Sequence, residues 1–349
     1  MRALTSRLLS LKVWNKLTAD VTQKSGPFLV KAKSSFSVSP KHGTFLFGNR
    51  SLSTETAAKV DPNIDANDNE VNLATLGRSK EKVDVDGMLI NWDRAGNGDH
   101  VVLLLPGIIG CIQHDFAPIF KKMDKTKYTL VSWDPPGYGR SRPPSRDFSG
   151  VFYRRDGHTV VKLMDKLGYD KFSILGWSNG GITGGHIAAD YPSRVHRLVT
   201  WGAHSFADER AVMFTKIMGD LDMWSPKMLE PAVAMYGRDY LLQMMQDWHK
   251  AVSEFYNDGL DATFKEGLPK IICPTLAIHG EEDPVLGVEH AEFLRDNIPN
   301  SKLWIMPKGK HNLHLRYTDE FLKVVTKFLD SYSISCFKLT TNLIHLYQL

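Results

Sequence analysis

The sequence is poor in cysteine and lacks long apolar runs. Its 349 residues include three widely spaced cysteines, Cys111, Cys273 and Cys336. They form neither a metal-type pair nor a disulfide framework, which predicts a reducing compartment for the mature protein. No apolar run reaches the roughly 18 residues that a membrane-spanning helix needs. With 42% hydrophobic and 23% charged residues, the composition is ordinary for a globular enzyme.

Acidic residues are nearly absent from the first 52 residues. This stretch contains nine Lys or Arg and a single acid, Asp20, so it carries a net charge of +8. The whole chain carries +4, which leaves −4 for residues 53–349. The basic excess therefore belongs to the N-terminus, and the sequence predicts no nucleic-acid-binding surface on the folded part.

Three segments are expected to lie outside the folded domain. The basic, Ser-rich composition of residues 1–52 predicts a mitochondrial transit peptide, with a cleavage-like sequence near Arg50. This places the protein in the mitochondrial matrix; the alternative is a disordered basic tail with no targeting role. Residues 53–80 are polar and acidic and are expected to be a linker. Residues 332–349 do not extend the pattern of the domain and are expected to be a poorly ordered tail of unknown role.

Residues 81–331 are expected to form one α/β domain. Asp86-Gly87 between two apolar segments predicts a β-hairpin. Short apolar runs predict strands at 101–105, 128–133, 172–176, 195–201, 275–279 and 301–306. Helical spacing predicts helices at 152–167, 179–190, 288–297 and 317–331. Strands that alternate with helices imply a mostly parallel sheet with helices on both faces. The Met- and Trp-rich stretch at about 204–266 interrupts this alternation and is expected to be a helical cap.

A strand followed by the pattern Gly-x-Ser-x-Gly is the strongest functional signal. Residues 176–180 read Gly-Trp-Ser-Asn-Gly between an apolar run and a helical stretch. Such a strand–turn–helix unit is the nucleophile elbow of the α/β-hydrolases, in which the glycines leave room for the tight turn. The pattern predicts Ser178 as a nucleophile; an ordinary Gly/Ser turn is the alternative.

A serine nucleophile needs a base and a carboxylate, which follow it along the chain in α/β-hydrolases. Asp283 follows the strand at 275–279 and is the predicted acid, with Glu281 and Glu282 as rival carboxylates. An acid in this position would fix the orientation and tautomer of the catalytic imidazole.

The predicted base is His311, which follows the strand at 301–306, and His314 is its competitor. A histidine pKa near 6.5 suits proton exchange at neutral pH. The isolated His196, His249 and His290 are expected to be exposed surface side chains.

The oxyanion of a tetrahedral intermediate also requires hydrogen-bond donors. The backbone N–H of Asn179, directly after the nucleophile, is one expected donor. The N–H of Ile108 in the loop after strand 101–105 is the other, with Ile109 as the alternative; the loop could also be a plain turn.

Four segments carry a family resemblance. Residues 105–107, 133–144, 176–183 and 309–316 read LPG, WDPPGYGRSRPP, GWSNGGIT and GKHNLHLR. In order and spacing they resemble the biphenyl hydrolase-like (valacyclovir hydrolase) family of α/β-hydrolases. The resemblance implies a mitochondrial serine hydrolase that cleaves α-amino acid esters, including amino-acid prodrugs of nucleoside analogues, without a cofactor. It also implies catalytic places for Ser178, Asp283 and His311.

One position departs from the family pattern. The family carries Asp directly after the serine, where a carboxylate can meet the substrate's α-ammonium group, whereas this chain carries Asn179. An amide brings no charge, and ionic hydrogen bonds are roughly twice as strong as neutral ones. Asn179 remains a candidate substrate-binding residue, but neutral esters or lactones become alternatives to α-amino esters.

The leading hypothesis is therefore a monomeric esterase that acts on a small-molecule ester through an acyl-enzyme. Hydrolysis of C–C bonds, as in ring-cleavage hydrolases, would use the same three residues and is a second hypothesis. A non-catalytic binding protein with the hydrolase fold is the third.

Overall fold

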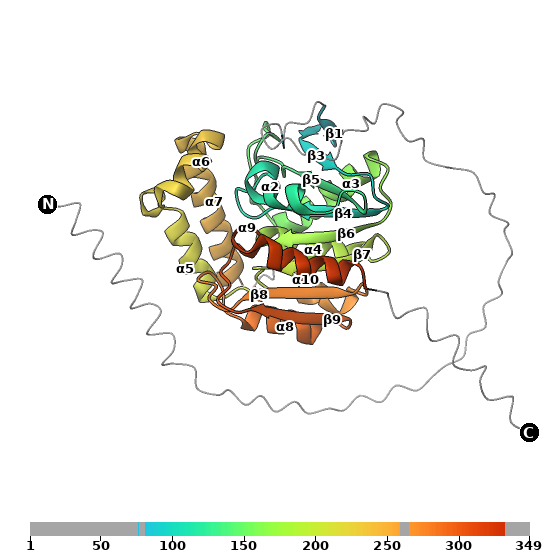
Figure 1. Cartoon of the computed structure of the whole chain (residues 1–349). Helices are drawn as coiled ribbons and strands as arrows, with labels where there is room; N and C mark the ends of the chain where they lie inside the picture. Colours follow the sequence, from blue (N-terminus) through green and yellow to red (C-terminus); the bar gives the residue numbers. More distant parts are fainter. Residues whose placement is uncertain (1–75, 77–80, 259–264, 332–349) are drawn as a thin grey trace, which may run out of the picture. The chain divides into compact units, whose positions relative to one another are not determined.

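The computed structural model describes Leu76, residues 81–258 and residues 265–331. Within this part a seven-stranded sheet has the order β3-β5-β4-β6-β7-β8-β9 (Figure 1). Its strands are β3 (Trp92–Ala95), β4 (His100–Leu105), β5 (Tyr128–Trp133), β6 (Phe172–Trp177), β7 (Val195–Trp201), β8 (Thr275–Gly280) and β9 (Ser301–Met306). Only the pairing of β3 with β5 is antiparallel among these described strands. The expected mostly parallel sheet is confirmed.

Helices cover both faces of the sheet. One face carries α2 (Ile112–Lys122), α9 (Leu313–Arg316) and α10 (Thr318–Leu329). The other carries α3 (Phe152–Lys166), α4 (Asn179–Asp190) and α8 (Glu289–Asn297). A small separate sheet pairs β1 (Val83–Val85) with β2 (Met88–Ile90). Its turn residues Asp86 and Gly87 have φ of 54° and 80°, as a two-residue hairpin turn of type I′ requires.

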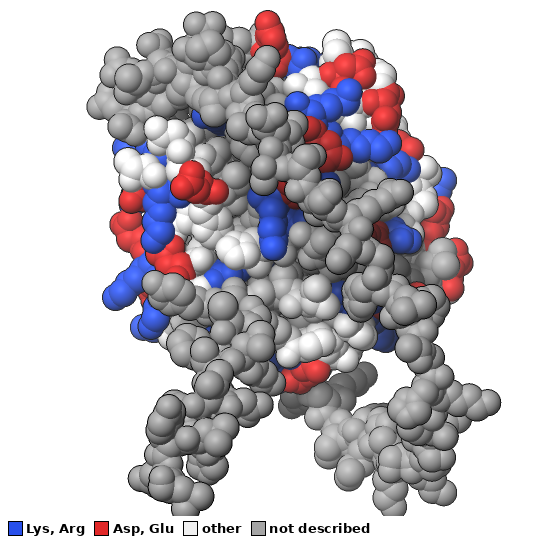
Figure 2. All heavy atoms as spheres, turned by 90° about the vertical axis from the view of Figure 1, so that its right-hand side faces the viewer, with Lys and Arg blue, Asp and Glu red and all other residues white. Residues whose placement is uncertain are grey.

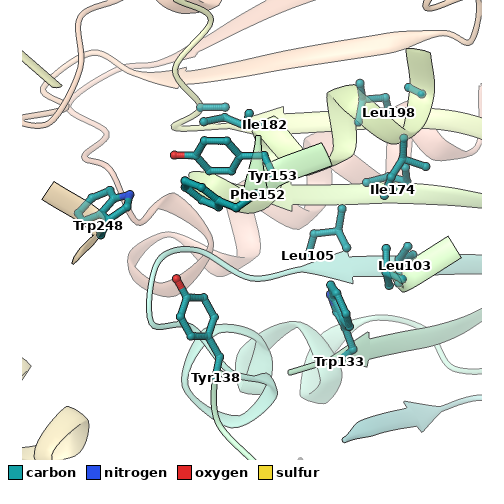
Figure 3. Close-up of a cluster of buried hydrophobic side chains, with 14 of the residues drawn as sticks. Leu103, Leu105, Trp133, Tyr138, Phe152, Tyr153, Ile174, Ile182, Leu198 and Trp248 are labelled. Carbon is teal, nitrogen blue, oxygen red and sulfur yellow. The ribbon is translucent and has the colours of Figure 1, made fainter. Parts of the chain in front are cut away.

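The apolar runs are continuous because the central strands are buried on both faces. In β4, Leu103 and Leu105 belong to the hydrophobic cluster beneath α3 and α4, whereas Val102 and Leu104 belong to the cluster beneath α2 and α10. Successive side chains of a strand point to opposite faces, so every position of such a strand must be apolar. Figure 3 shows Leu103 and Leu105 with their neighbours in the first of these clusters.

The cap is helical throughout its described part. It comprises α5 (Glu209–Met218), η1 (Leu221–Met223), α6 (Pro226–Tyr236), α7 (Arg238–Asn257) and η2 (Lys265–Lys270). No strand occurs between β7 and β8 in the described residues of this stretch. Trp248 of α7 faces Phe152 and Tyr153 of α3 (Figure 3), so the apolar side chains of the cap extend the core of the domain.

Three predicted segments fall outside the described residues: the transit peptide at 1–52, the linker at 53–80 except for Leu76, and the tail at 332–349. Leu76 is buried in the cluster beneath α2 and α10. Within the described part, no helix has the length and apolar character needed to cross a membrane. On one face of the molecule, the described Lys and Arg side chains lie among Asp and Glu side chains (Figure 2).

Candidate active site

Ser178 lies at the turn between β6 and α4. Its backbone has φ 54° and ψ −119°, a left-handed conformation that costs a residue with a side chain on the order of 1–3 kcal/mol. Its N–H donates to the carbonyl of Trp201 on β7 at 2.9 Å. A Cβ at Gly176 would clash with the backbone of Gly180, and a Cβ at Gly180 would clash with Leu105. The two glycines therefore permit this turn, and the serine stands at the end of the sheet.

Asp283 and His311 meet in a buried hydrogen bond. His311 Nδ1 lies 2.9 Å from Asp283 Oδ2, and the two side chains are 17% and 1% exposed. Asp283 Oδ1 accepts the N–H of Val285 at 2.8 Å. Burial would raise the pKa of Asp283, but the charge of His311 and these hydrogen bonds lower it below its usual value. The carboxylate is therefore ionised at neutral pH and directs the other ring nitrogen, Nε2, away from itself.

Two contacts bring His311 to the end of the strand that carries Ser178. Trp177, the residue before the serine, donates from Nε1 to the backbone oxygen of His311 at 3.1 Å. Gly202 follows β7, and a Cβ there would lie only 2.9 Å from Cε1 of His311. Since Ser178 is hydrogen-bonded to Trp201, the serine and the imidazole both adjoin the end of β7.

The rival residues have other partners. Glu281 accepts the N–H of Lys308 at 3.0 Å, and Glu282 faces Lys310 at 3.9 Å. His314 is fully buried, and its Nδ1 accepts from Trp201 Nε1 at 3.0 Å. None of the three is hydrogen-bonded to His311 in the described part of the chain.

The expectation of exposed histidines is wrong for His290. This side chain is fully buried on α8, where Ser205 N–H donates to Nδ1 at 3.2 Å and Asp208 lies at Nε2. Its partners lie about eighty positions earlier in the chain, so local spacing gives no sign of the burial. His196 and His249 are half-buried.

The loop after β4 is held from both sides. Asp115 of α2 accepts the N–H of Gly107 at 3.0 Å, and burial raises the pKa of Asp115 to about 7. Tyr236 of the cap donates its hydroxyl to the carbonyl of Ile109 at 2.7 Å. Ile109 itself has φ 50°. These contacts fix the backbone on either side of Ile108, whose N–H is the expected donor.

An apolar pocket adjoins Ser178 beneath the cap. About 530 Å³ of empty space lies between its lining atoms, a figure that includes the open solvent at its mouth. Its apolar wall includes Ile182, Phe206, Phe214, Trp248, Phe255 and Val285.

Three polar atoms in the pocket-lining residues lack partners. Among the buried side-chain polar atoms of the described residues, Asn179 Nδ2, His204 Nε2 and Trp248 Nε1 have no hydrogen-bond partner, and all three residues line the pocket. A buried donor or acceptor without a partner costs about 1–3 kcal/mol, so these atoms are candidates to meet a ligand. His204 also lies close to Asp208 and His290, the one group of three potential metal ligands in the described residues. Sequence reasoning missed His204 and Asp208 because neither stands in a recognisable motif.

The comparisons with known proteins agree with this architecture. A family model described as the alpha/beta hydrolase fold matches residues 100–234. The protein named serine hydrolase BPHL is 43% identical in Mus musculus over 74% of this chain and 89% of that protein. In Homo sapiens the identity is 42%, over 71% of this chain and 85% of that protein. A solved structure of a membrane phospholipase A superposes with a TM-score of 0.62 at 20% identity, covering 74% of this chain and 87% of that one.

Proposed function

Because this chain belongs to the α/β-hydrolase family and is a serine hydrolase, we propose that it cleaves carboxylic esters through Ser178, His311 and Asp283. The observation that carries the proposal is the buried hydrogen bond between Asp283 and His311 beside a serine in a strained turn. A carboxylate on Nδ1 holds the imidazole in the tautomer whose Nε2 can accept the serine proton.

The chemistry then follows in two halves. Ser178 Oγ attacks the ester carbonyl carbon while His311 Nε2 takes its proton, and Asp283 stabilises the resulting imidazolium. The tetrahedral intermediate collapses as the imidazolium protonates the departing alcohol, which leaves an acyl-enzyme. Water activated by the same imidazole attacks the acyl group, and the acid and free serine are released.

The N–H groups of Asn179 and Ile108 are the proposed donors to the oxyanion, with Ile109 as the alternative to Ile108. Asn179 is the first residue of α4, so its N–H has no acceptor within the helix. The hydrogen bonds that Gly107 and Ile109 make to Asp115 and Tyr236 would keep the loop donor in place during the reaction. Loss of one such donor typically costs about 10²–10³ in rate.

We propose that the substrates are esters of small apolar acids, including α-amino acid esters and the amino-acid esters of nucleoside analogues. The aliphatic and aromatic wall of the pocket supports an apolar acyl group. Asn179 offers a neutral amide, whose carbonyl can accept from an ammonium group but adds no charge. The preference for an α-amino ester over its des-amino analogue is therefore expected to be small.

The location in the mitochondrial matrix and the monomeric state are also proposals. The first is supported by the nine basic residues and single acid of residues 1–52. Fusion of these residues to a fluorescent protein tests it: import with processing near Arg50 is expected, and a fusion that stays cytosolic would overturn it.

The test of the reaction is a panel of p-nitrophenyl and amino-acid esters assayed with the wild type and with Ser178→Ala. We expect ester turnover by the wild type and its loss in the variant, which should keep the far-UV circular dichroism of the wild type. Retained turnover in the variant contradicts the mechanism. A dienone acid in the same panel distinguishes C–C hydrolysis, and inactivity on every compound would favour a binding protein.

A further inference from the structure

A second, smaller cavity adjoins the pocket at Ser178. About 290 Å³ of empty space lies between its lining atoms, including the open solvent at its mouth, against about 530 Å³ for the pocket. Tyr153 and Asn179 line both spaces, which therefore share a wall. Figure 3 shows several of its lining residues, namely Leu105, Trp133, Tyr138, Phe152 and Tyr153. The catalytic proposal assigns no role to this cavity.

The wall of this cavity contains side-chain N–H donors that have no acceptor. They are Trp133 Nε1, Arg146 Nε and Asn179 Nδ2, which are buried and lack a hydrogen-bond partner within the described part of the chain. The hydroxyl of Tyr138, which can donate or accept, is a fourth such atom in the wall. The Arg146 side chain is only 3% exposed. Buried donors are nearly always paired in folded proteins, so a group of unpaired donors around one small space indicates a place for an acceptor.

The contacts of Arg146 keep its Nε free for a ligand. Nη1 and Nη2 donate to the two carboxylate oxygens of Asp156 at 2.9 and 2.6 Å, and Nη1 also donates to the carbonyl of Pro136 at 3.1 Å. The guanidinium lies over the ring of Tyr138, 4.5 Å from its centroid. Both oxygens of Asp156 are thus engaged at the far end of the guanidinium, and the charges of the pair offset each other.

The unpaired atoms decide which chemical group the cavity can take. The indole N–H of Trp133 and the Nε–H of Arg146 can only donate, so the group must present an acceptor. An ammonium group offers donors alone and cannot pair with them. A carboxylate would bring a charge that Arg146 does not balance, because Asp156 already neutralises it, and burying an unbalanced charge is costly. A neutral oxygen, such as that of an ether or a ketone, meets both requirements.

The position of the cavity assigns that oxygen to the acyl half of the substrate. Pro106 and Gly107, from the loop of the proposed oxyanion donor, line the cavity together with Asn179. All its lining residues lie between positions 105 and 183, so the segments of Asp283 and His311 contribute nothing to the wall. The departing alcohol must reach His311 to be protonated. A group that enters the cavity therefore belongs to the acyl chain.

We propose that this cavity is a subsite for a neutral oxygen acceptor on the acyl chain, which receives hydrogen bonds from Trp133, Arg146 and Asn179. The subsite selects oxygen-bearing acyl esters over hydrocarbon esters of the same length, because only the oxygen pairs with the buried donors. This inference rests on the proposed function, since the selection acts on ester hydrolysis.

The test uses the full chain and two matched pairs of p-nitrophenyl esters: methoxyacetate with butanoate, and 3-methoxypropanoate with pentanoate. Each pair replaces one CH₂ group by an ether oxygen. Each kcat/KM is divided by the rate constant of hydroxide-catalysed hydrolysis, which removes the intrinsic reactivity of the ester. We expect the oxygen-bearing ester to be favoured about tenfold in at least one pair, as two hydrogen bonds of ordinary strength would give.

Trp133→Phe removes one donor and keeps an aromatic ring, so it should lower this ratio about threefold or more. Trp92→Phe is the matched control. Trp92 Nε1 is also buried without a partner in the described residues, and Trp92 lies opposite Trp133 in the sheet, but it does not line the cavity. Its ratio should equal that of the wild type. Asn179→Ala, which removes the donor shared with the pocket, provides the same test if Trp133→Phe does not fold.

Wild-type ratios near one in both pairs would overturn the subsite and leave the cavity to water. A raised ratio that stays unchanged in Trp133→Phe and Asn179→Ala would also overturn it, because the preference would then arise elsewhere. Turnover of hydrocarbon esters without selection refutes the subsite alone, whereas a wild type that hydrolyses none of the four esters refutes the proposed function and the subsite with it.

Discussion

At the scale of single residues, the site depends on a strained serine held by its neighbours. The carbonyl of Ser178 accepts from Gly181 and Ile182 in the first turn of α4, and its N–H donates to Trp201. These bonds, together with the space at Gly176 and Gly180, offset the conformational cost of a left-handed residue. The hydroxyl is thereby presented beside the pocket rather than folded against the helix.

The first prediction concerns the carboxylate. Asp283→Asn removes the charge that stabilises the His311 imidazolium and fixes the wrong tautomer, so kcat for ester hydrolysis should fall by about 10⁴, as it does in serine proteases. Glu282→Gln is the control, since Glu282 is exposed and faces Lys310. If steady-state kinetics show similar losses in the two variants, Asp283 does not have the role proposed for it.

The second prediction concerns substrate choice. Asn179→Asp places a carboxylate at the start of α4, where the helix dipole tolerates negative charge. A charged hydrogen bond to an α-ammonium group gains about 1–2 kcal/mol over a neutral one, which is about tenfold in kcat/KM. The ratio of kcat/KM for a valine ester to that for its des-amino analogue should rise in the Asp variant and not in Asn179→Ala. An unchanged ratio in the Asp variant would refute the substrate contact.

Some site residues could be predicted from local sequence, and others could not, because their partners are distant in the chain. Ser178, Asp283 and His311 each follow a recognisable strand, so their order along the chain marks them, although their catalytic roles stay predictions. His204 and His290 meet only in the folded chain. His290 lies in a helix that is rich in charged residues, EHAEFLRDN, and His204 lies outside any helix or strand, so neither stands in a local pattern that indicates burial.

At the scale of elements, the cap does more than cover the pocket. Tyr236 at the end of α6 donates to the carbonyl of Ile109 at 2.7 Å and accepts the N–H of Gly139 at 2.9 Å. It therefore joins the cap to the loop that carries Ile108. Tyr240 of α7 makes an equivalent pair of bonds to Gly137 and Arg146, each at 2.8 Å.

This pair of tyrosines gives the third prediction. Tyr236→Phe leaves a buried carbonyl and N–H unpaired, which costs about 1–3 kcal/mol of folding free energy, and it frees the loop of the proposed oxyanion donor. We expect kcat to fall on the order of tenfold or more. Tyr240→Phe should lose similar stability in urea unfolding but keep kcat. Equal kcat in the wild type and Tyr236→Phe would show that the loop needs no support from the cap.

The strands were more predictable than some helices. Buried parallel strands are short continuous apolar runs, and all six predicted runs are strands within a residue of their expected bounds. The helix α2 was not predicted; it contains Pro118, which normally indicates a break. The last predicted helix, 317–331, is α10 (Thr318–Leu329), whereas the short α9 (Leu313–Arg316) before it was not predicted. Tyr317, whose φ is −129°, separates the two helices.

At the scale of the whole domain, buried ionisable groups connect stability to pH. His314 is fully buried among Trp201, Phe116 and Phe321. Burial lowers its pKa from 6.5 to about 3. The native state therefore leaves His314 neutral while the unfolded chain takes up a proton below about pH 6.5. The contribution of His314 to the free energy of unfolding is therefore fully present above pH 6.5 and is lost as the pH falls toward 3. Asp115, with its raised pKa, acts in the opposite direction.

The fourth prediction is therefore a difference between variants. His314→Gln should be less stable than the wild type at pH 7.5, because ring packing is lost. As the pH falls from 6.5 to 5, the free energy of unfolding of this variant should decrease less than that of the wild type. The two slopes should differ by on the order of 1 kcal/mol per pH unit. His158→Gln, at the surface, should keep the wild-type slope. Parallel slopes for wild type and His314→Gln in urea unfolding would contradict a neutral buried imidazole.

The most direct measurement is covalent labelling of the full chain by a fluorophosphonate, with the modified residue located by peptide mass spectrometry. Our account predicts one adduct, on Ser178, whose formation slows severely in His311→Ala. An unlabelled Ser178 in active protein, or an adduct on another residue with turnover unaffected by Ser178→Ala, would contradict it.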